Sequence, residues 1–191
     1  VLSIATAGAG SVLLGVAIGV TAMSTAAGAI SGAFSAITNG TSFAAGVFGG
    51  AIRGFGTGAA IGLGIMTGGG AIGAIPALLG AVCMNYLTGS LAYVVENGLN
   101  GQEISWKGAM ISGGLQALTS LFDFGTGFIM GGLGIYNVPG NGLLNALKTE
   151  GLKKLFTSIA FRNILGGFLL KSVLLWPISN LLRSIQKQNL Y

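Results

Sequence analysis

Few residues in this chain of 191 could carry out chemistry, and their types and spacing do not fit a catalytic or metal centre. The chain has no histidine, so neither a serine–histidine–aspartate triad nor a cysteine–histidine pair can form within it. The four carboxylates, Glu96, Glu103, Asp123 and Glu150, lie far apart in sequence, without the spacing of metal ligands. We therefore predict a protein that is not an enzyme and that uses no cofactor and no metal.

Two further sequence features, a glycine-rich run and a single cysteine, do not indicate a nucleotide-binding site or a disulfide. The run Gly54–Gly58, Gly-Phe-Gly-Thr-Gly, resembles a dinucleotide fingerprint, but it follows no predicted strand and no ribose-binding acid comes about 20 residues later. The single Cys83 cannot form an internal disulfide. Because Cys83 lies in an apolar run, we expect a small buried thiol there.

Arg53 is the only charged residue among the first 95. An ionisable residue inside an apolar span is a functional candidate, and Arg53 would then be a lumen charge in a water-filled path. Alternatively, it marks the end of an interfacial helix, with its stem reaching the lipid headgroups. We expect Asp123 to cap a helix, or to pair with Arg53 or Lys107, and we expect Glu96 and Glu103 to be solvated acids beside a polar loop.

The elements that would position these residues are marked by glycine. Five glycines recur at every fourth position, namely Gly46, Gly50, Gly54, Gly58 and Gly62. This spacing places them on one side of a helix as a ridge without side chains. In water each such glycine costs about 1 kcal/mol relative to alanine, whereas in lipid the helix is nearly obligatory and the ridge lets a second helix approach closely.

Other small residues repeat the same step of four. They are Gly15 with Gly19, then Ser24, Gly28, Gly32, Ala36 and Gly40, then Ala60, Gly64 and Gly68, and finally Gly127 with Gly131. A flexible linker would be polar, whereas these glycines alternate with Ala, Val, Ile, Leu and Phe. The pattern therefore predicts helices that pack tightly in or against a bilayer.

Composition and charge divide the chain into two predicted domains. Glycine accounts for 36 residues, 52% of the chain is apolar, and 7% is charged, against about a quarter in an ordinary domain. Residues 1–141 form the predicted glycine-zipper domain, with two basic and three acidic residues. Residues 142–191 form a predicted basic amphipathic tail with a net charge of +6, from Lys148, Lys153, Lys154, Arg162, Lys171, Arg183 and Lys187 against Glu150.

The basic residues of the tail alternate with Leu, Phe and Ile at helical spacing. This arrangement suits a bilayer surface with anionic lipids, and it argues against nucleic acid as the partner. We expect helices nearly throughout, because apolar and polar residues do not alternate as in strands. The expected helical stretches are 2–20, 22–38, 42–66, 71–96 with a bend at Pro76, a helix capped by Ser105, 143–154 and 157–187, with polar loops at 97–102 and 137–141.

A resemblance to a known family adds to this interpretation. The glycine-rich stretches, the segment Asn97–Ala109 (NGLNGQEISWKGA) and the run Gly113-Gly114-Leu115 resemble the C-terminal toxin regions of bacterial polymorphic toxins. They are similar in particular to LXG-type effectors that type VII secretion systems export. The similarity covers residues 15–135. It implies a pore-forming domain that is secreted by its producer, inserts into the membrane of a competing bacterium and is countered by a membrane-embedded immunity protein.

The sequence thus predicts an all-α, glycine-zipper bundle that inserts into a lipid bilayer, self-associates and makes the bilayer leaky. We expect the zipper faces to pack against each other first in a compact form that hides apolar surface. The N-terminal domain of LXG effectors is absent here, so we interpret the chain as a segment of a longer protein. The alternatives are a constitutive membrane channel or Tim-type translocase subunit with GxxxG-packed spans, and a membrane-crossing delivery segment of a larger toxin.

Overall fold

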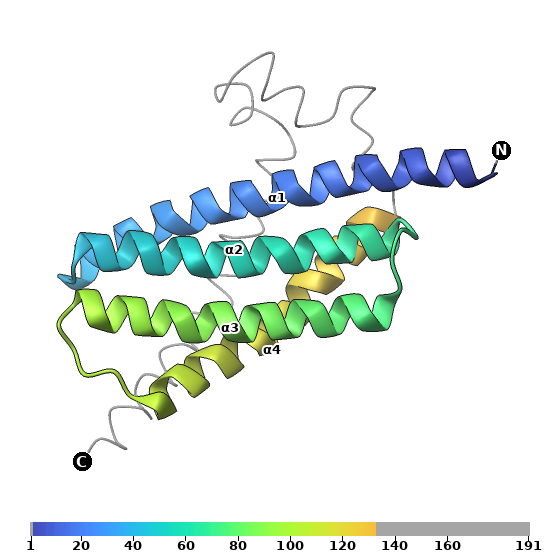
Figure 1. Ribbon diagram of the computed structural model, residues 1–191. Coiled ribbons are helices and arrows are strands. Elements are labelled where there is room, and N and C mark those ends of the chain that lie inside the picture. The colour runs from blue at the N-terminus through green and yellow to red at the C-terminus, as the bar shows by residue number, and fades with distance from the viewer. Residues whose placement is uncertain (1, 133–191) are drawn as a thin grey trace, which may run out of the picture. The chain divides into compact units, whose positions relative to one another are not determined.

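The computed structural model describes residues 2–132, and within that range the protein consists of four α-helices without a strand (Figure 1). The helices are α1 (Leu2–Asn39), α2 (Phe43–Gly68), α3 (Ala74–Leu99) and α4 (Trp106–Gly132). The prediction of an all-helical fold is confirmed for this part of the chain. The predicted tail, the loop at 137–141 and the tail's seven basic residues lie outside the described residues, and the domain boundary at 141 stays a prediction.

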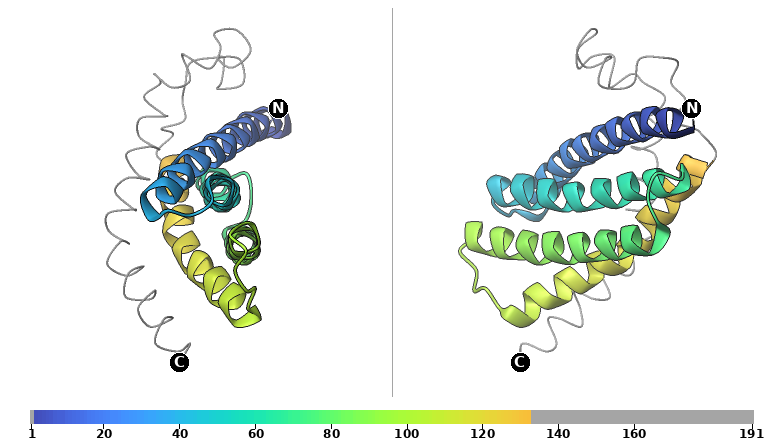
Figure 2. Two further views of the ribbon diagram at one scale, coloured as in Figure 1. Left: turned by 90° about the vertical axis from the view of Figure 1, so that its left-hand side faces the viewer. Right: turned by 45° about the vertical axis from the view of Figure 1, so that its right-hand side comes forward.

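The helix α2 occupies the centre of the arrangement. Helices α1, α2 and α3 lie side by side, each antiparallel to the one before it (Figures 1 and 2). Helix α4 crosses behind α2 and α3 at an oblique angle (Figure 1). Among these four helices, α1 contacts α2 alone, whereas α2, α3 and α4 all contact one another. The described helices therefore pack through two interfaces, one between α1 and α2 and one among α2, α3 and α4.

The two ends of the helix array differ in polarity. One end carries the connections Gly40–Ser42 and Asn100–Ser105, which are linked because the Ser42 N–H donates to Asn100 Oδ1 at 2.8 Å. We call it the polar end. The opposite end carries the connection Gly69–Gly73 between α2 and α3, which has no polar side chain and which we call the apolar tip.

The helix α1 is one continuous helix, whereas the sequence suggested two apolar stretches, 2–20 and 22–38. Thr21, which lies between them, does not interrupt the helix, because its hydroxyl donates to the Ala17 carbonyl at 2.9 Å. The expected bend at Pro76 is also absent. Pro76 is the third residue of α3, in the first turn, where a missing N–H removes no helical hydrogen bond.

The connection between α3 and α4 begins later than the sequence indicated. Helix α3 continues to Leu99, and the Asn97 side chain, expected in a loop, donates to the Tyr93 carbonyl at 2.7 Å. The chain then turns at Gly101, whose φ of 66° favours glycine. The predicted cap at Ser105 is confirmed, because the Gly108 N–H donates to Ser105 Oγ at 3.2 Å.

Small residues occupy most of the buried positions, and many large apolar side chains are exposed. Buried positions are mostly glycine, alanine and small polar residues, and the buried cluster around α2, α3 and α4 contains Ala60, Ala77, Ala81 and Phe124. Large apolar side chains point outward instead, among them Trp106 at 87% exposed, Ile75 at 75% and Phe122 at 74%. Cys83 is exposed as well, so the expected burial of its thiol was wrong, and the compact form does not hide its large apolar side chains.

Candidate functional site

Helix α2 packs against α1 through the predicted glycine ridge, with backbone touching backbone. A Cβ on Gly50 would overlap the carbonyl oxygen of Gly28, and a Cβ on Gly46 would overlap that of Gly32. Reciprocally, a Cβ on either α1 glycine would overlap the carbonyl of its α2 partner. We call this contact the glycine seam. It requires glycine on both helices at once.

The seam continues along α2 with a regular antiparallel register. A Cβ on Gly54 would overlap the Ser24 carbonyl oxygen, and a Cβ on Gly58 would lie 2.6 Å from the Thr21 Cα. Gly62 is looser, since its Cβ would lie 3.0 Å from the Ala17 Cβ. The helices are therefore closest from Gly46 to Gly58 and widen slightly toward the apolar tip.

The N-terminal ladder of Gly15 and Gly19 is a separate part of α1 from the residues that meet the ridge most closely. A Cβ on Gly15 would meet nothing within 4 Å, so the seam does not require glycine there. Gly19 is buried on α1. The ladder that meets the ridge is the one formed by Ser24, Gly28 and Gly32, which the sequence pattern had also identified.

A second close contact joins α2 to α4. A Cβ on Gly127 would overlap the carbonyl oxygen of Ile61, and a Cβ on Gly131 would overlap that of Ile65. Conversely, a Cβ on Gly64 would overlap the Phe124 carbonyl. Helix α2 thus carries two rows of small residues on neighbouring faces. The ridge contacts α1, and the row of Ala60, Gly64 and Gly68 contacts α4.

Arg53 pairs with Glu96 of α3. Its Nη1 donates to Glu96 Oε1 and its Nη2 donates to Oε2 at 2.8 Å, which is the bidentate geometry of a strong guanidinium–carboxylate pair. Gly49 makes room for the pair, because a Cβ there would overlap the Glu96 carboxylate. The Arg53 side chain is 41% exposed and that of Glu96 is 27% exposed.

This ion pair corrects two expectations. Glu96 is not a solvated loop acid but lies on α3, one turn before its end, and it pairs with Arg53, for which Asp123 had been an expected partner. Asp123 does not cap a helix either. It lies inside α4, is 5% exposed, and faces the helix array rather than a helix end.

Amide and hydroxyl groups form a buried polar cluster where α2, α3 and α4 meet. Asn85 is fully buried and its Nδ2 donates to the Gly56 carbonyl of α2 at 3.0 Å. Gln116 of α4 is 8% exposed, and its Nε2 lies 3.1 Å from the Arg53 carbonyl, 3.3 Å from Asn85 Oδ1 and 3.2 Å from Thr88 Oγ1. Hydrogen bonds from the Asn85 and Gln116 side chains therefore join α2, α3 and α4.

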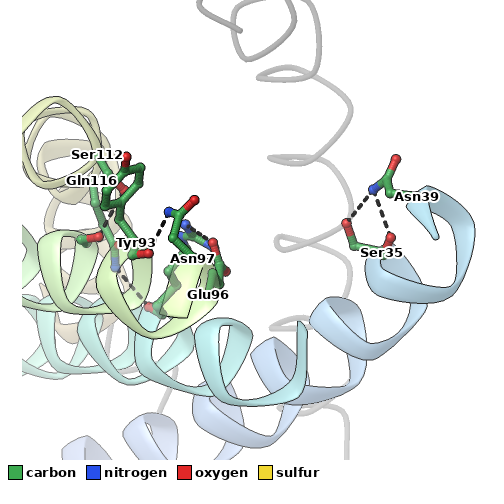
Figure 3. A network of polar contacts seen from close by, with 9 residues as sticks. Ser35, Asn39, Tyr93, Glu96, Asn97, Ser112 and Gln116 are labelled. Atoms are coloured by element: carbon green, nitrogen blue, oxygen red, sulfur yellow. Dashed lines mark hydrogen bonds and ion pairs between the residues drawn. The ribbon is translucent and has the colours of Figure 1, made fainter. Parts of the chain in front are cut away.

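The cluster leaves one acceptor without a partner. Gln116 Oε1 is buried and accepts no hydrogen bond. Figure 3 shows Gln116 and Ser112 of α4 beside Tyr93, Glu96 and Asn97 of α3, so the buried amide and the carboxylate of the ion pair occupy the same part of the helix array. The Gly56 backbone comes so close that a Cβ there would overlap Thr88 Oγ1.

Replacing Asn85 with alanine should destabilise the described fold by about 1–2 kcal/mol, since removing one partner of a buried hydrogen bond leaves the other unsatisfied at a cost of this order. The variant loses the bond to Gly56 and one acceptor for Gln116. Asn97→Ala is the matched control, because the hydrogen bond of the Asn97 side chain lies within its own helix. Unfolding in mixed detergent micelles measures both variants, and equal loss of stability would show that the cluster does not hold the helices together.

Within residues 2–132, no group of three or more His, Cys, Asp or Glu side chains lies together as a metal ligand set would. Comparison with protein-family models, with curated proteins and with solved structures gave no match. The resemblance to the toxin regions of LXG effectors therefore stays a prediction.

Sequence reasoning missed the polar cluster and the partner of Arg53. The signal for the cluster was present, because Asn85 and Thr88, and likewise Gln116, Ser120 and Asp123, recur at helical spacing within apolar stretches. The partner of Arg53 had no comparable signal. Glu96 lies 43 residues away, and only the antiparallel register of α2 and α3 brings the two together.

Proposed function

We propose that this chain is a membrane-embedded helical domain that permeabilises a lipid bilayer. One observation carries the proposal, namely that many large apolar side chains lie on the outside of the described helices while glycine, alanine and a few polar residues take most of the buried positions. A water-soluble monomer rarely exposes extensive apolar surface, and such surface marks an interaction with a membrane or a partner. A bilayer fits this distribution because it covers all sides of the helices.

The lengths and compositions of the helices agree with this proposal. Residues 13–39 of α1 and the whole of α3 are long and apolar enough to cross a membrane. Apolar core helices of soluble proteins also meet that criterion but are mostly buried, whereas these windows are 44% and 28% buried. At about 1.5 Å per residue, α2, α3 and α4 each extend about 39–40 Å, more than the hydrocarbon core of about 30 Å.

The glycine seam supports a membrane location independently. In water, a helix interface made of glycine buries little apolar area, and every glycine weakens its own helix. In lipid the helix is maintained by its backbone hydrogen bonds, and close backbone contact is the usual basis of helix association. The seam is therefore an arrangement that a bilayer favours and water does not.

The proposed mechanism differs in one respect from the sequence-based expectation. The glycine seam is satisfied within one chain, and the large apolar side chains are exposed already. We propose that the described fold is the membrane-embedded form and that copies of it associate in the bilayer through their exposed faces. The buried polar cluster of Asn85, Thr88 and Gln116 would then supply polar groups near a conducting path.

A constitutive membrane channel or translocase subunit is the second candidate. The specific observation that favours it is the complete internal pairing of the seam glycines from Gly46 to Gly58, which is typical of a stably integrated membrane protein. A membrane-embedded immunity protein is the partner expected under the first proposal and not under the second.

Expression of the chain in bacteria that report membrane potential separates these functions. We expect growth arrest with depolarisation, and release of a small dye from liposomes to which the purified chain is added. Stable integration into membranes without depolarisation or dye release would instead favour the channel or translocase subunit. Failure to associate with membranes at all would contradict both.

A further inference from the structure

We infer that the apolar tip between α2 and α3 is the surface that enters and crosses the bilayer first, and that the polar end stays on the side from which the protein arrives. This inference rests on the proposed function and adds a direction to it. The surface is the Gly69–Gly73 connection with the adjoining turns of the two helices, and its partner is the hydrocarbon core of a bilayer.

The position of charge is the first observation. Residues 54–95 contain no charged residue, so the α2–α3 hairpin is uncharged from just after Arg53 to just before Glu96. On α2, this leaves about 22 Å of uncharged helix between Arg53 and the tip. The two charges of the hairpin belong to one ion pair, and Glu96 lies one turn from the polar end of α3.

The backbone of the apolar tip is the second observation. The N–H groups of Gly69, Gly70 and Ala71 donate to the carbonyls of Ile65, Thr67 and Met66 at 2.8–2.9 Å. Three successive donors are thus paired inside the turn. Unpaired backbone groups are what prevent a loop from entering hydrocarbon. The side chains beside the turn are apolar and exposed, with Ile75 at 75% and Leu79 at 60%.

The polar end has the opposite character. Gln102, Glu103 and Lys107 are all exposed there, and moving their polar and charged groups through hydrocarbon is unfavourable. Trp106, the most exposed of the large apolar side chains in the described parts of α1 to α4, begins α4 at the same end. An exposed tryptophan beside charged groups is typical of the membrane–water interface.

Among the described Asp, Glu, Lys and Arg residues, Asp123 is the one that lies nearer the apolar tip than the polar end. It belongs to α4 rather than to the hairpin, and it is 5% exposed. The Asp123 side chain is therefore withdrawn from the surface. The part of the α2–α3 hairpin between Arg53 and Glu96 therefore has no charged residue on the surface that would enter the bilayer first.

Site-specific labelling tests the direction of entry. In a Cys83→Ser background, Ala71→Cys marks the apolar tip and Gln102→Cys marks the polar end, and both positions are exposed. The full chain is added to preformed vesicles of phosphatidylcholine and phosphatidylglycerol. A maleimide on a polymer too large to leak inward is then applied outside. We expect Gln102→Cys to react and Ala71→Cys to react only after detergent opens the vesicles.

A charge placed at each end provides the matched comparison. Ala71→Glu should reduce the fraction of protein that floats with the vesicles by about tenfold or more, because a carboxylate must then cross the hydrocarbon. Gln102→Glu adds the same charge at the end that does not cross, and it should change that fraction by less than about twofold.

The outcomes distinguish this inference from the proposed function. If the parent floats with vesicles and Ala71→Cys reacts from outside as fast as Gln102→Cys, the direction of entry is wrong while the function stands. If Ala71→Glu floats with the vesicles as well as the parent does, the direction of entry is likewise wrong while the function stands. If the parent itself does not float with vesicles, both the function and the inference fail.

Discussion

Replacing Gly50 with alanine should separate α1 from α2 and abolish dye release from liposomes. The added methyl group would overlap the Gly28 carbonyl, which belongs to a helix backbone and cannot turn aside as a side chain would. We expect a loss of about 3 kcal/mol or more, at the upper end of overpacking effects, although alanine is the better helix former. Dye release and unfolding in mixed micelles measure the two effects.

The chain supplies its own control for this substitution. A Cβ on Gly114 or on Gly125 would meet nothing within 4 Å. Alanine at these positions of α4 therefore gains helix propensity without a clash, and dye release should match that of the parent. Normal dye release by the Gly50 variant, with helix content unchanged, would show that the glycine seam is not required for permeabilisation.

The glycine ridge could be recognised in the sequence because it is a local pattern. Five glycines at a spacing of four define one face of one helix, and the spacing alone places them together. The partner ladder on α1 has the same pattern. What the sequence did not reveal was which row on α2 meets which helix, because the crossing of α4 behind α2 depends on the packing of all three helices.

Burial could not be predicted from the usual assumptions about apolar residues. Cys83 was expected to be buried because it lies in an apolar run, which holds when the core is apolar and the surroundings are water. In this fold most buried positions are taken by small residues and by polar side chains such as Asn85, and many large apolar side chains are exposed. The assumption that apolar residues are buried therefore placed Cys83 on the wrong face of α3. The matching assumption that polar residues are exposed explains why Asn85 and Gln116 were not identified as buried.

The Arg53–Glu96 pair had no local signal of this kind, and neutralising its two members gives the last prediction. Arg53→Gln leaves the Glu96 carboxylate without its cation, and Glu96→Gln leaves the guanidinium without its anion. The pair is partly exposed, so we expect each single variant to lose about 1–2 kcal/mol, less than a fully buried pair would lose. The double variant contains no unpaired charge and should be more stable than the sum of the single effects implies.

The same variants decide between the two interpretations of Arg53. If the pair lines a conducting path, Glu96→Gln should shift the reversal potential in a salt gradient toward anions and Arg53→Gln toward cations, because a lumen charge selects the ions that enter. If the pair anchors the helices near the headgroups, neither variant should change the reversal potential, and both should reduce the number of channels. The structure favours the anchoring interpretation, because Glu96 lies one turn from the polar end and the guanidinium bonds to it there. A reversal potential that shifts in opposite directions in the two single variants, and returns to the parent value in the double variant, would establish the lumen interpretation instead.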